Sequence, residues 1–207
     1  DLLRLVKSDV FIFADVSGSI QSDNKAKLSS RPFLTDNEWG DYTKKISEIS
    51  NRLEDIGIPM SYHEHMGTII QTEKDVHRLM NDTNDNTFLL FDTGHLMFAK
   101  ADYEKILHKY ISRINHVHCK DVRKIILEKS INNDLSFRDS FLDGVFTVPG
   151  DGCIDYKPLL KILKKNNYNK WLIIEAEQDP KKANPFEYAK IGNRYLKGII
   201  DEVGYKI

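Results

Sequence analysis

Residues 87–95 read TFLLFDTGH, an apolar run that ends in an aspartate, a turn and a histidine. Every position between Thr87 and Asp92 is apolar. A strand with one face in solvent alternates apolar and polar residues, whereas a short continuous apolar run is typical of a parallel strand buried on both faces. We therefore predict a buried strand over 87–92, with polar side chains gathered at its carboxyl end.

The same pattern recurs along the chain, and helical patterns separate the repeats. The other apolar runs are VFIFAD (10–15), IPMSYH (58–63), RINHVH (113–118) and WLIIEA (171–176). Helices are predicted over residues 37–56, 73–81, 101–111, 156–166 and 185–203. The first should begin near Thr35 or Asp36 and end at Gly57, and the last has Pro185 near its first turn. Strands that alternate with helices predict right-handed βαβ units and a parallel sheet.

The fold class expected from this pattern is α/β, of the (β/α)₈ barrel type, with only about five βα units in a single domain over residues 1–207. A complete barrel needs eight units and about 250 residues. An open, doubly wound sheet is the alternative, but the GxGxxG phosphate motif after the first strand is absent. Two polar segments, 16–36 and 121–153, interrupt the rhythm and are predicted to be long functional or disordered loops.

Composition narrows the function classes. The 41% hydrophobic and 29% charged residues are ordinary for a soluble globular protein. A formal net charge of -1 and the lack of a basic stripe argue against nucleic acid or an anionic membrane as partner. No apolar run approaches the roughly 20 residues that span a bilayer. Cys119 and Cys153 do not make a disulfide framework and no signal peptide is apparent, so the cytoplasm is the expected compartment.

The ends of the predicted strands carry the chemistry. Five of the seven histidines lie there, together with several carboxylates: His63, His65, His95, His116, His118, Asp92, Glu175 and Glu177. The carboxyl ends of the strands are where a parallel barrel collects its catalytic groups. Imidazole and carboxylate groups that converge from separate strands suit Mn²⁺, Co²⁺ or Zn²⁺. For Asp92 the alternative is a turn cap, which the following Thr-Gly also suits.

Strand periodicity assigns faces at two of these strand ends. His63 and His65 share a face, and Glu64 is expected on the opposite, helical side as a structural or ion-paired group. His116, His118 and Lys120 also share a face. Because at most two of these three can reach a metal, His116 is the expected structural member.

Three further features have a structural interpretation beside a functional one. Cys119 faces away from its neighbours His118 and Lys120 and is expected to be an inert packed thiol. Of Glu175 and Glu177, one should point into the barrel mouth while the other anchors its rim. Residues 148–156 form either a tight turn with Asp155 near the N-cap of the next helix or a loop that contacts substrate.

Several of these segments together closely resemble the myo-inosose-2 dehydratases of inositol catabolism. The resemblance covers nearly the whole chain, and the run FTVPGDGCID with EAEQDP and ANPFEYAK is specific to that family. More broadly, the chain is similar to the xylose-isomerase-like sugar isomerase and endonuclease barrels. The matching segments are DVSGSIQ (15–21), LSSRPFLTDNEW (28–39), YHEHMGT (62–68), LLFDTGHLMFA (89–99), INHVHCKDVR (114–123), GVFTVPGDGCIDY (144–156) and WLIIEAEQDPKKANPFEYA (171–189).

The resemblance implies a reaction and a cofactor. Water would be lost from 2-keto-myo-inositol (scyllo-inosose), through an enediolate, to give a trihydroxycyclohexane-1,2-dione. The cofactor would be Mn²⁺ or Co²⁺, with Zn²⁺ as an alternative. Family members carry roughly three more βα units upstream, which implies that this chain is an N-terminally incomplete barrel with two unpaired edges.

The resemblance also implies a ligand set and residue roles. The superfamily uses Glu, Asp, His and Glu from four strands. Asp92, His118 and Glu175 match the last three, and the first falls on His63, with Glu64 or His65 as alternatives. The candidate acid–base groups are His95, Lys120 and His65, and the resemblance favours His95 because a histidine three residues after the metal-binding aspartate contacts substrate in the superfamily. The candidate substrate-binding residues are Glu177, Arg123 and Asp151.

Two alternative functions remain. One is a sugar or keto-acid isomerase or epimerase on the same barrel, which would share the metal but lose no water. The other is an inactive, truncated product. The dehydratase and the isomerase or epimerase would each take a small cyclitol or sugar as substrate, and a homo-oligomer is compatible with both enzymes.

Overall fold

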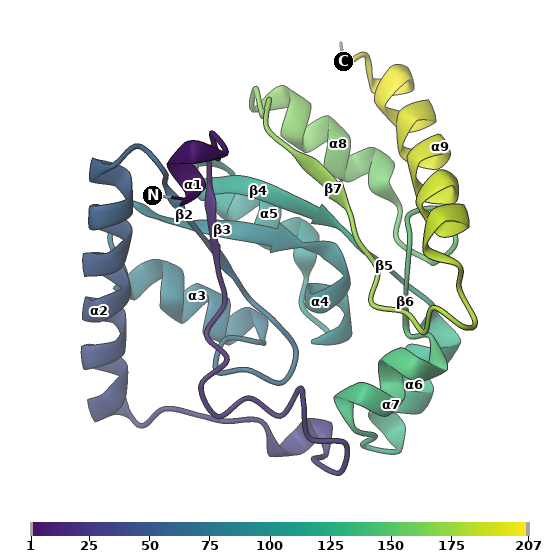
Figure 1. The fold of residues 1–207 in the computed structure, drawn as a ribbon, viewed down its shortest axis with the longest axis horizontal. Helices are drawn as coiled ribbons and strands as arrows, with labels where there is room; N and C mark the ends of the chain where they lie inside the picture. Colours follow the sequence, from purple (N-terminus) through teal and green to yellow (C-terminus); the bar gives the residue numbers. More distant parts are fainter. Residues whose placement is uncertain (1, 206–207) are drawn as a thin grey trace.

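A computed structural model describes residues 2–205 and contains a curved sheet of five parallel strands (Figure 1). Neighbouring strands in the sheet are also neighbours in the chain, in the order β1 (Phe11–Phe13), β2 (Met60–His63), β3 (Thr87–Asp92), β4 (Ile114–Cys119) and β7 (Leu172–Ile174). A doubly wound sheet reverses its strand order at a switch point, and this sheet does not. The predicted barrel-type fold with five βα units is therefore confirmed.

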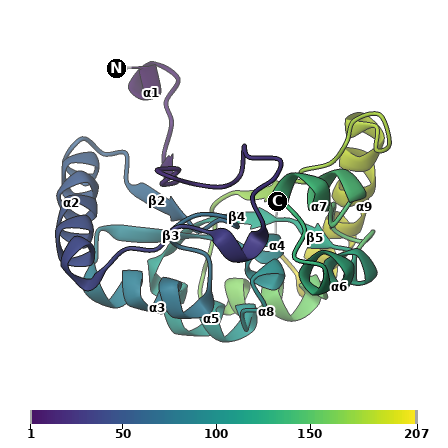
Figure 2. The same ribbon diagram turned by 90° about the horizontal axis from the view of Figure 1, so that it is seen from below.

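The predicted helices cover one face of the sheet. Figure 2 shows α2, α3, α5 and α8 along the convex side, as the outer layer of a barrel would lie. The helices are α2 (Asp36–Asp55), α3 (Glu73–Asp82), α5 (Tyr103–Tyr110), α8 (Tyr156–Lys165) and α9 (Pro185–Val203). None of the helices within residues 2–205 combines the length and apolar character that a membrane crossing needs.

Local capping explains where these helices begin. Thr35 accepts a hydrogen bond from the Glu38 amide while the Glu38 carboxylate reaches back, which makes the capping box that starts α2. Thr72 starts α3 in the same way. Helix α5 begins two residues later than predicted because Asp102 is its N-cap.

The two long segments are more structured than predicted. Residues 121–153 contain helices α6 (Lys124–Asn132) and α7 (Phe137–Asp143), and a two-stranded antiparallel sheet of β5 (Asp121–Val122) and β6 (Phe146–Thr147). Short elements also occur elsewhere: α1 (Leu2–Leu5), η1 (Leu28–Ser30), α4 (Thr93–Phe98) and η2 (Ile111–Arg113). Elements of two to nine residues are too short to show a clear periodicity, and they form here because caps and neighbouring segments hold them.

Burial differs between the central and the outer strands. Strands β2 and β4 are buried at every position and β3 at all but one, as predicted. Strands β1 and β7 are only partly buried, and Ile12 of β1 is 42% exposed. The prediction of burial on both faces is thus wrong for these two, because each pairs with a neighbour on one side only within the described residues.

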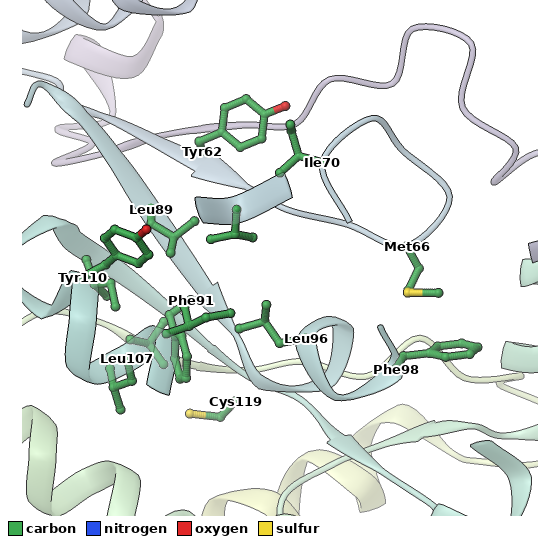
Figure 3. Close-up of a cluster of buried hydrophobic side chains, with 14 of the residues drawn as sticks. Tyr62, Met66, Ile70, Leu89, Phe91, Leu96, Phe98, Leu107, Tyr110 and Cys119 are labelled. Atoms are coloured by element: carbon green, nitrogen blue, oxygen red, sulfur yellow. The ribbon is translucent and has the colours of Figure 1, made fainter. Parts of the chain in front are cut away.

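The main apolar core lies between the sheet and the outer helices. Leu89 and Phe91 point from β3 towards Leu107 and Tyr110 of α5 (Figure 3), while the Tyr62 hydroxyl of β2 contacts that of Tyr42 on α2. The alternation along each strand sends the intervening side chains, including those of His63 and Asp92, to the concave face. Cys119 is buried within this core, and burial raises the pKa of its thiol far above the ordinary value, as expected for an inert packed cysteine.

Replacing Arg113 should destabilise the sheet. Its guanidinium donates to the carbonyl oxygens of Met80, Asn84 and Thr87 at 2.5–2.7 Å, which ties α3 to the amino end of β3. We expect Arg113→Ala to lower the free energy of unfolding by about 2 kcal/mol in urea titrations, because these part-buried carbonyls lose a charged donor. Arg138→Ala is the control, since Arg138 makes one exposed contact with Asn24, and equal losses in both variants would contradict this role.

Candidate metal centre

Four side chains from four strand ends converge on the concave side of the sheet. Strand pairing places Asp92 directly beside His118, while His63 ends β2 and Glu175 follows β7. His118 Nδ1 lies 2.5 Å from a Glu175 oxygen and 3.4 Å from Asp92 Oδ2, and His63 Nε2 lies 3.8 Å from the same Asp92 oxygen. Each residue offers one ligand atom, and the four atoms lie within 4.8 Å of one another.

The polar atoms at this centre suit a divalent cation. Asp92 Oδ2, His118 Nδ1 and Glu175 Oε2 are buried, and none makes a well-aligned hydrogen bond with any described residue. Buried polar atoms are normally satisfied, so three that converge without hydrogen bonds fit a shared metal ion. The mixture of imidazole and carboxylate donors is one that Mn²⁺, Co²⁺ and Zn²⁺ accept.

The two carboxylate oxygens of Asp92 make different contacts. Oδ1 accepts hydrogen bonds from the amides of Gly94 and His95, both at 2.9 Å, and so caps helix α4. Oδ2 is left to face His118 and His63. The turn-cap interpretation of Asp92 is therefore confirmed, and it does not compete with a place in the metal centre.

The His63 ring is oriented by its own backbone. Its Nδ1 contacts the carbonyl oxygen of Glu64, which leaves Nε2 directed towards Asp92. In a metal-binding histidine, the ring nitrogen that does not bind the metal usually donates to a carbonyl or carboxylate oxygen, which fixes the orientation of the ring. The structure thus brings His63 into the four-residue group, while the alternatives Glu64 and His65 stay outside it.

A second group of ligand-type side chains lies beside the first. His65, His95 and Glu177 each offer one atom, again within 4.8 Å of one another. Lys120 is fully buried between the two groups. Its ammonium lies 2.9 Å from His95 Nε2, 3.1 Å from a Glu177 oxygen and 3.2 Å from a Glu175 oxygen.

The surroundings shift the pKa values of Lys120 and His95 in opposite directions. Burial opposes a charge on Lys120, but Asp92, Glu177 and Glu175 outweigh it and raise the pKa of the ammonium. Burial, followed by the charges of His65 and Lys120, lowers the pKa of His95 to about 4, so its ring is neutral at pH 7.

The carboxylates respond in the opposite sense. Burial alone would raise the pKa of Glu177, but the charge of Lys120 and hydrogen bonds from His65 and His95 lower it far below its ordinary value. Glu175 and Glu177 both contact the Lys120 ammonium. The prediction that one of them points into the mouth while the other merely anchors its rim is therefore wrong.

Glu64 and His116 lie outside the four-residue group, and the structure tests what the sequence predicted for each. Glu64 is fully buried, and its carboxylate makes no ion pair within residues 2–205, so the structure favours the structural over the ion-paired alternative. Burial and then the charge of Asp92 raise the pKa of Glu64 well above its ordinary value. His116 is excluded from the four-residue group, as expected, and burial lowers its pKa to about 4.

Arg123 and Asp151 pair with each other. The guanidinium donates to the Asp151 carboxylate at 2.6 Å, and the Thr147 hydroxyl donates to the same oxygen at 2.6 Å. Asp155 caps α8, so the tight-turn interpretation of residues 148–156 is confirmed. Within residues 2–205, neither Arg123 nor Asp151 makes a hydrogen bond or ion pair with any member of the two ligand-type groups.

Sequence reasoning missed Asp121, the residue that holds this loop. Its carboxylate accepts hydrogen bonds from the amides of Val122, Gly150 and Ile154. A Cβ on Gly152 would lie 2.1 Å from the Asp121 carboxylate, so the loop can wrap this closely only around a glycine. The GDG spacing was a signal for a tight loop, but nothing local indicated its anchor.

The two long segments meet beside the second histidine group. Ser29 donates to Asp134 through both its amide and its hydroxyl, at 2.9 and 2.6 Å. Gln21 from the first segment contacts His65 Nδ1, and the Phe137 ring from the second lies 5.4 Å from the His65 ring. These neighbours of the site arise from contacts over 40 to 110 residues of chain, which no local pattern could indicate.

Comparison with known proteins now identifies the family. Residues 13–199 match the model of the xylose isomerase-like TIM barrel. The chain belongs to this family. It is 42% identical to an inosose dehydratase of Glaesserella parasuis over 96% of the chain and 68% of that protein. It is 40% identical to the rhizopine catabolism protein MocC of Rhizobium meliloti over 100% of the chain and 63% of that protein. The resemblance to inosose dehydratases is therefore confirmed.

Solved structures agree with the fold. A probable 3-DHS dehydratase, AsbF, from Bacillus anthracis matches with a TM-score of 0.69 at 14% identity, over 95% of the chain and 66% of AsbF. The IOLI protein with a bound zinc atom matches with a TM-score of 0.63 at 17% identity, over 86% of the chain and 61% of IOLI. The chain spans about two thirds of the length of its relatives.

The metal-free protein should lose stability as pH rises from about 6.5 to about 9. Burial opposes a charge on His118, but Asp92 and Glu175 raise its pKa to about 9, against about 6.5 when unfolded. The folded state then holds a proton that the unfolded state has lost. This stabilisation is complete below pH 6.5 and is lost as pH rises through 9, with a slope of up to about 1.4 kcal/mol per pH unit.

Urea titrations at several pH values would measure this slope. His118→Asn should abolish it, and bound metal should also abolish it because the metal displaces the proton. An unchanged slope in His118→Asn would show that another group is responsible.

Proposed function

We propose that the protein to which this chain belongs is a cytoplasmic hydro-lyase that removes water from 2-keto-myo-inositol (scyllo-inosose) to give a trihydroxycyclohexane-1,2-dione. The observation that carries the proposal is the convergence of buried ligand atoms from Asp92, His118 and Glu175 beside a buried Lys120 ammonium. Relatives named inosose dehydratase support the choice of substrate. The proposed cofactor is Mn²⁺ or Co²⁺, with Zn²⁺ as an alternative, held by these three residues and His63.

The reaction needs a proton removed next to a ketone and a hydroxyl expelled one carbon further along. The divalent metal, when bound, would polarise the ketone and make the neighbouring proton more acidic. Lys120 is charged, so it can only donate: it would stabilise the negative charge that develops on the ketone oxygen or protonate the departing hydroxyl.

Three groups would complete the proton transfers. His95, with its pKa lowered to about 4, is neutral and can accept a proton. Together with Lys120 it is our preferred acid–base group facing the substrate. His65 Nε2 lies 3.6 Å from Glu177, so the ionised carboxylate would orient this ring towards the substrate. Glu177, which is partly exposed, is the proposed ligand for substrate hydroxyls.

Arg123 and Asp151 have a more indirect part in this proposal. Their ion pair holds β5, β6 and the loop after β6 together. They would hold the loop of residues 148–156 in shape and contact a substrate from the rim of the site.

Removing the proposed ligands should abolish metal binding and turnover together. We expect Asp92→Asn and Glu175→Gln to lose bound metal in elemental analysis and to lower dione formation by at least about 100-fold. Glu128→Gln and Asp201→Asn remove exposed carboxylates of the same types and are the controls. If the site variants keep both metal and turnover, this ligand set is wrong.

The isomerase or epimerase alternative makes a different product. The intact protein should be incubated with scyllo-inosose and with a ketohexose, while dione absorbance is followed. Inversion or isomerisation of the ketohexose without dione formation would establish the alternative function. A folded, metal-loaded protein that converts neither substrate would establish the inactive product.

A further inference from the structure

Two groups of metal-ligand type stand side by side, and a lysine lies between them. The first is His63, Asp92, His118 and Glu175, and the second is His65, His95 and Glu177. Both groups are compact enough to hold an ion, because the ligand atoms of each lie within 4.8 Å of one another. Paired metal sites in hydrolytic enzymes lie about 3.5–4 Å apart, so two adjacent groups would suit a pair of ions.

The Lys120 ammonium already occupies the position that a second ion would take. It lies 2.9 Å from His95 Nε2 and 3.1 Å from a Glu177 oxygen, both members of the second group. It also lies 3.2 Å from Glu175 and 3.5 Å from Asp92, both members of the first. One cation therefore contacts both groups.

Packing holds the ammonium in place. Lys120 is 0% exposed, and Phe146 lies 5.0 Å from its nitrogen. A Cβ on Gly94 would come within 2.5 Å of the Lys120 side chain, so the aliphatic stem fills the space above the start of α4. The lysine cannot swing into solvent without a rearrangement of these neighbours.

Charge balance points the same way. The carboxylates in contact with Lys120 are those of Asp92, Glu175 and Glu177. Their three negative charges are matched by the single charge of the ammonium and the two charges of one divalent ion. A second divalent ion next to the charged lysine would leave two positive charges in excess in this site, which is strongly unfavourable, whereas two ions beside an uncharged residue 120 would leave only one.

We propose that Lys120 is a built-in cation that fills the second of two adjacent cation positions, so that an uncharged residue at 120 turns His65, His95 and Glu177 into a second divalent-metal site. The inference rests on the proposed function only in taking the first group as a metal site.

The test compares metal content in variants of the intact protein. Wild type, Lys120→Met and the charge-preserving control Lys120→Arg are loaded with Mn²⁺, freed of excess metal by gel filtration, and analysed for manganese per chain. We expect about one ion in wild type and Lys120→Arg, and about two in Lys120→Met. Two Mn²⁺ ions this close also couple magnetically, so Lys120→Met should show a broadened electron paramagnetic resonance spectrum that wild type lacks.

A double variant assigns the second ion. Adding Glu177→Gln to Lys120→Met removes a ligand of the second group only, and the manganese content should return to about one. Lys120→Gln is a second uncharged replacement that should behave as Lys120→Met does if the Met variant does not fold.

Three results would overturn the inference. These are two ions in wild type, one ion in an uncharged variant whose circular dichroism is native, and a second ion that survives Glu177→Gln. Failure of the proposed function looks different: a wild type with one tightly bound ion but no dehydration of scyllo-inosose would leave the role of Lys120 intact.

Discussion

Asp92 connects the fold to the site through its two carboxylate oxygens. One oxygen caps α4 and so fixes the start of the helix that carries Gly94 and His95. The other faces His118 and the Lys120 ammonium. Because Asp92 is fully buried at the end of a central strand, water cannot replace either set of contacts. The position of His95, the packing of the lysine stem and the metal centre all follow from this one carboxylate.

Burial makes the site electrostatically demanding. The Lys120 ammonium and the Asp92 carboxylate are fully buried, where an unpaired charge is costly, and the partly exposed carboxylates of Glu175 and Glu177 lie beside them. Their mutual attraction keeps the lysine charged and the carboxylates ionised, while His95 loses its proton. A site built this way offers fixed donors and acceptors to a polar substrate without having to reorganise.

The concave face and the two outer strands carry exposed apolar side chains and unpartnered polar atoms within residues 2–205. Ile12 on β1 and Trp171 before β7 are exposed, and both ring nitrogens of His116 lack a hydrogen-bond partner within residues 2–205. The relatives are about half as long again as the part that matches. Closing a sheet into a barrel removes exposed edges, and five strands do not close one. The interior polar groups are those that such closure would cover.

The sequence by itself determined the strands, most helices and the strand ends at which ligand-type residues lie. Period-2 and period-3.6 patterns are local, and a parallel sheet brings all carboxyl strand ends to one rim, so Asp92, His118 and Glu175 could be expected together. Only the tertiary structure decided that Lys120 lies between two groups, that Glu64 is unpaired and that Asp121 anchors the loop near Gly152. Those features depend on contacts between residues far apart in the chain, and on burial, which strengthens the electrostatic interactions between charged groups. A local sequence pattern contains neither.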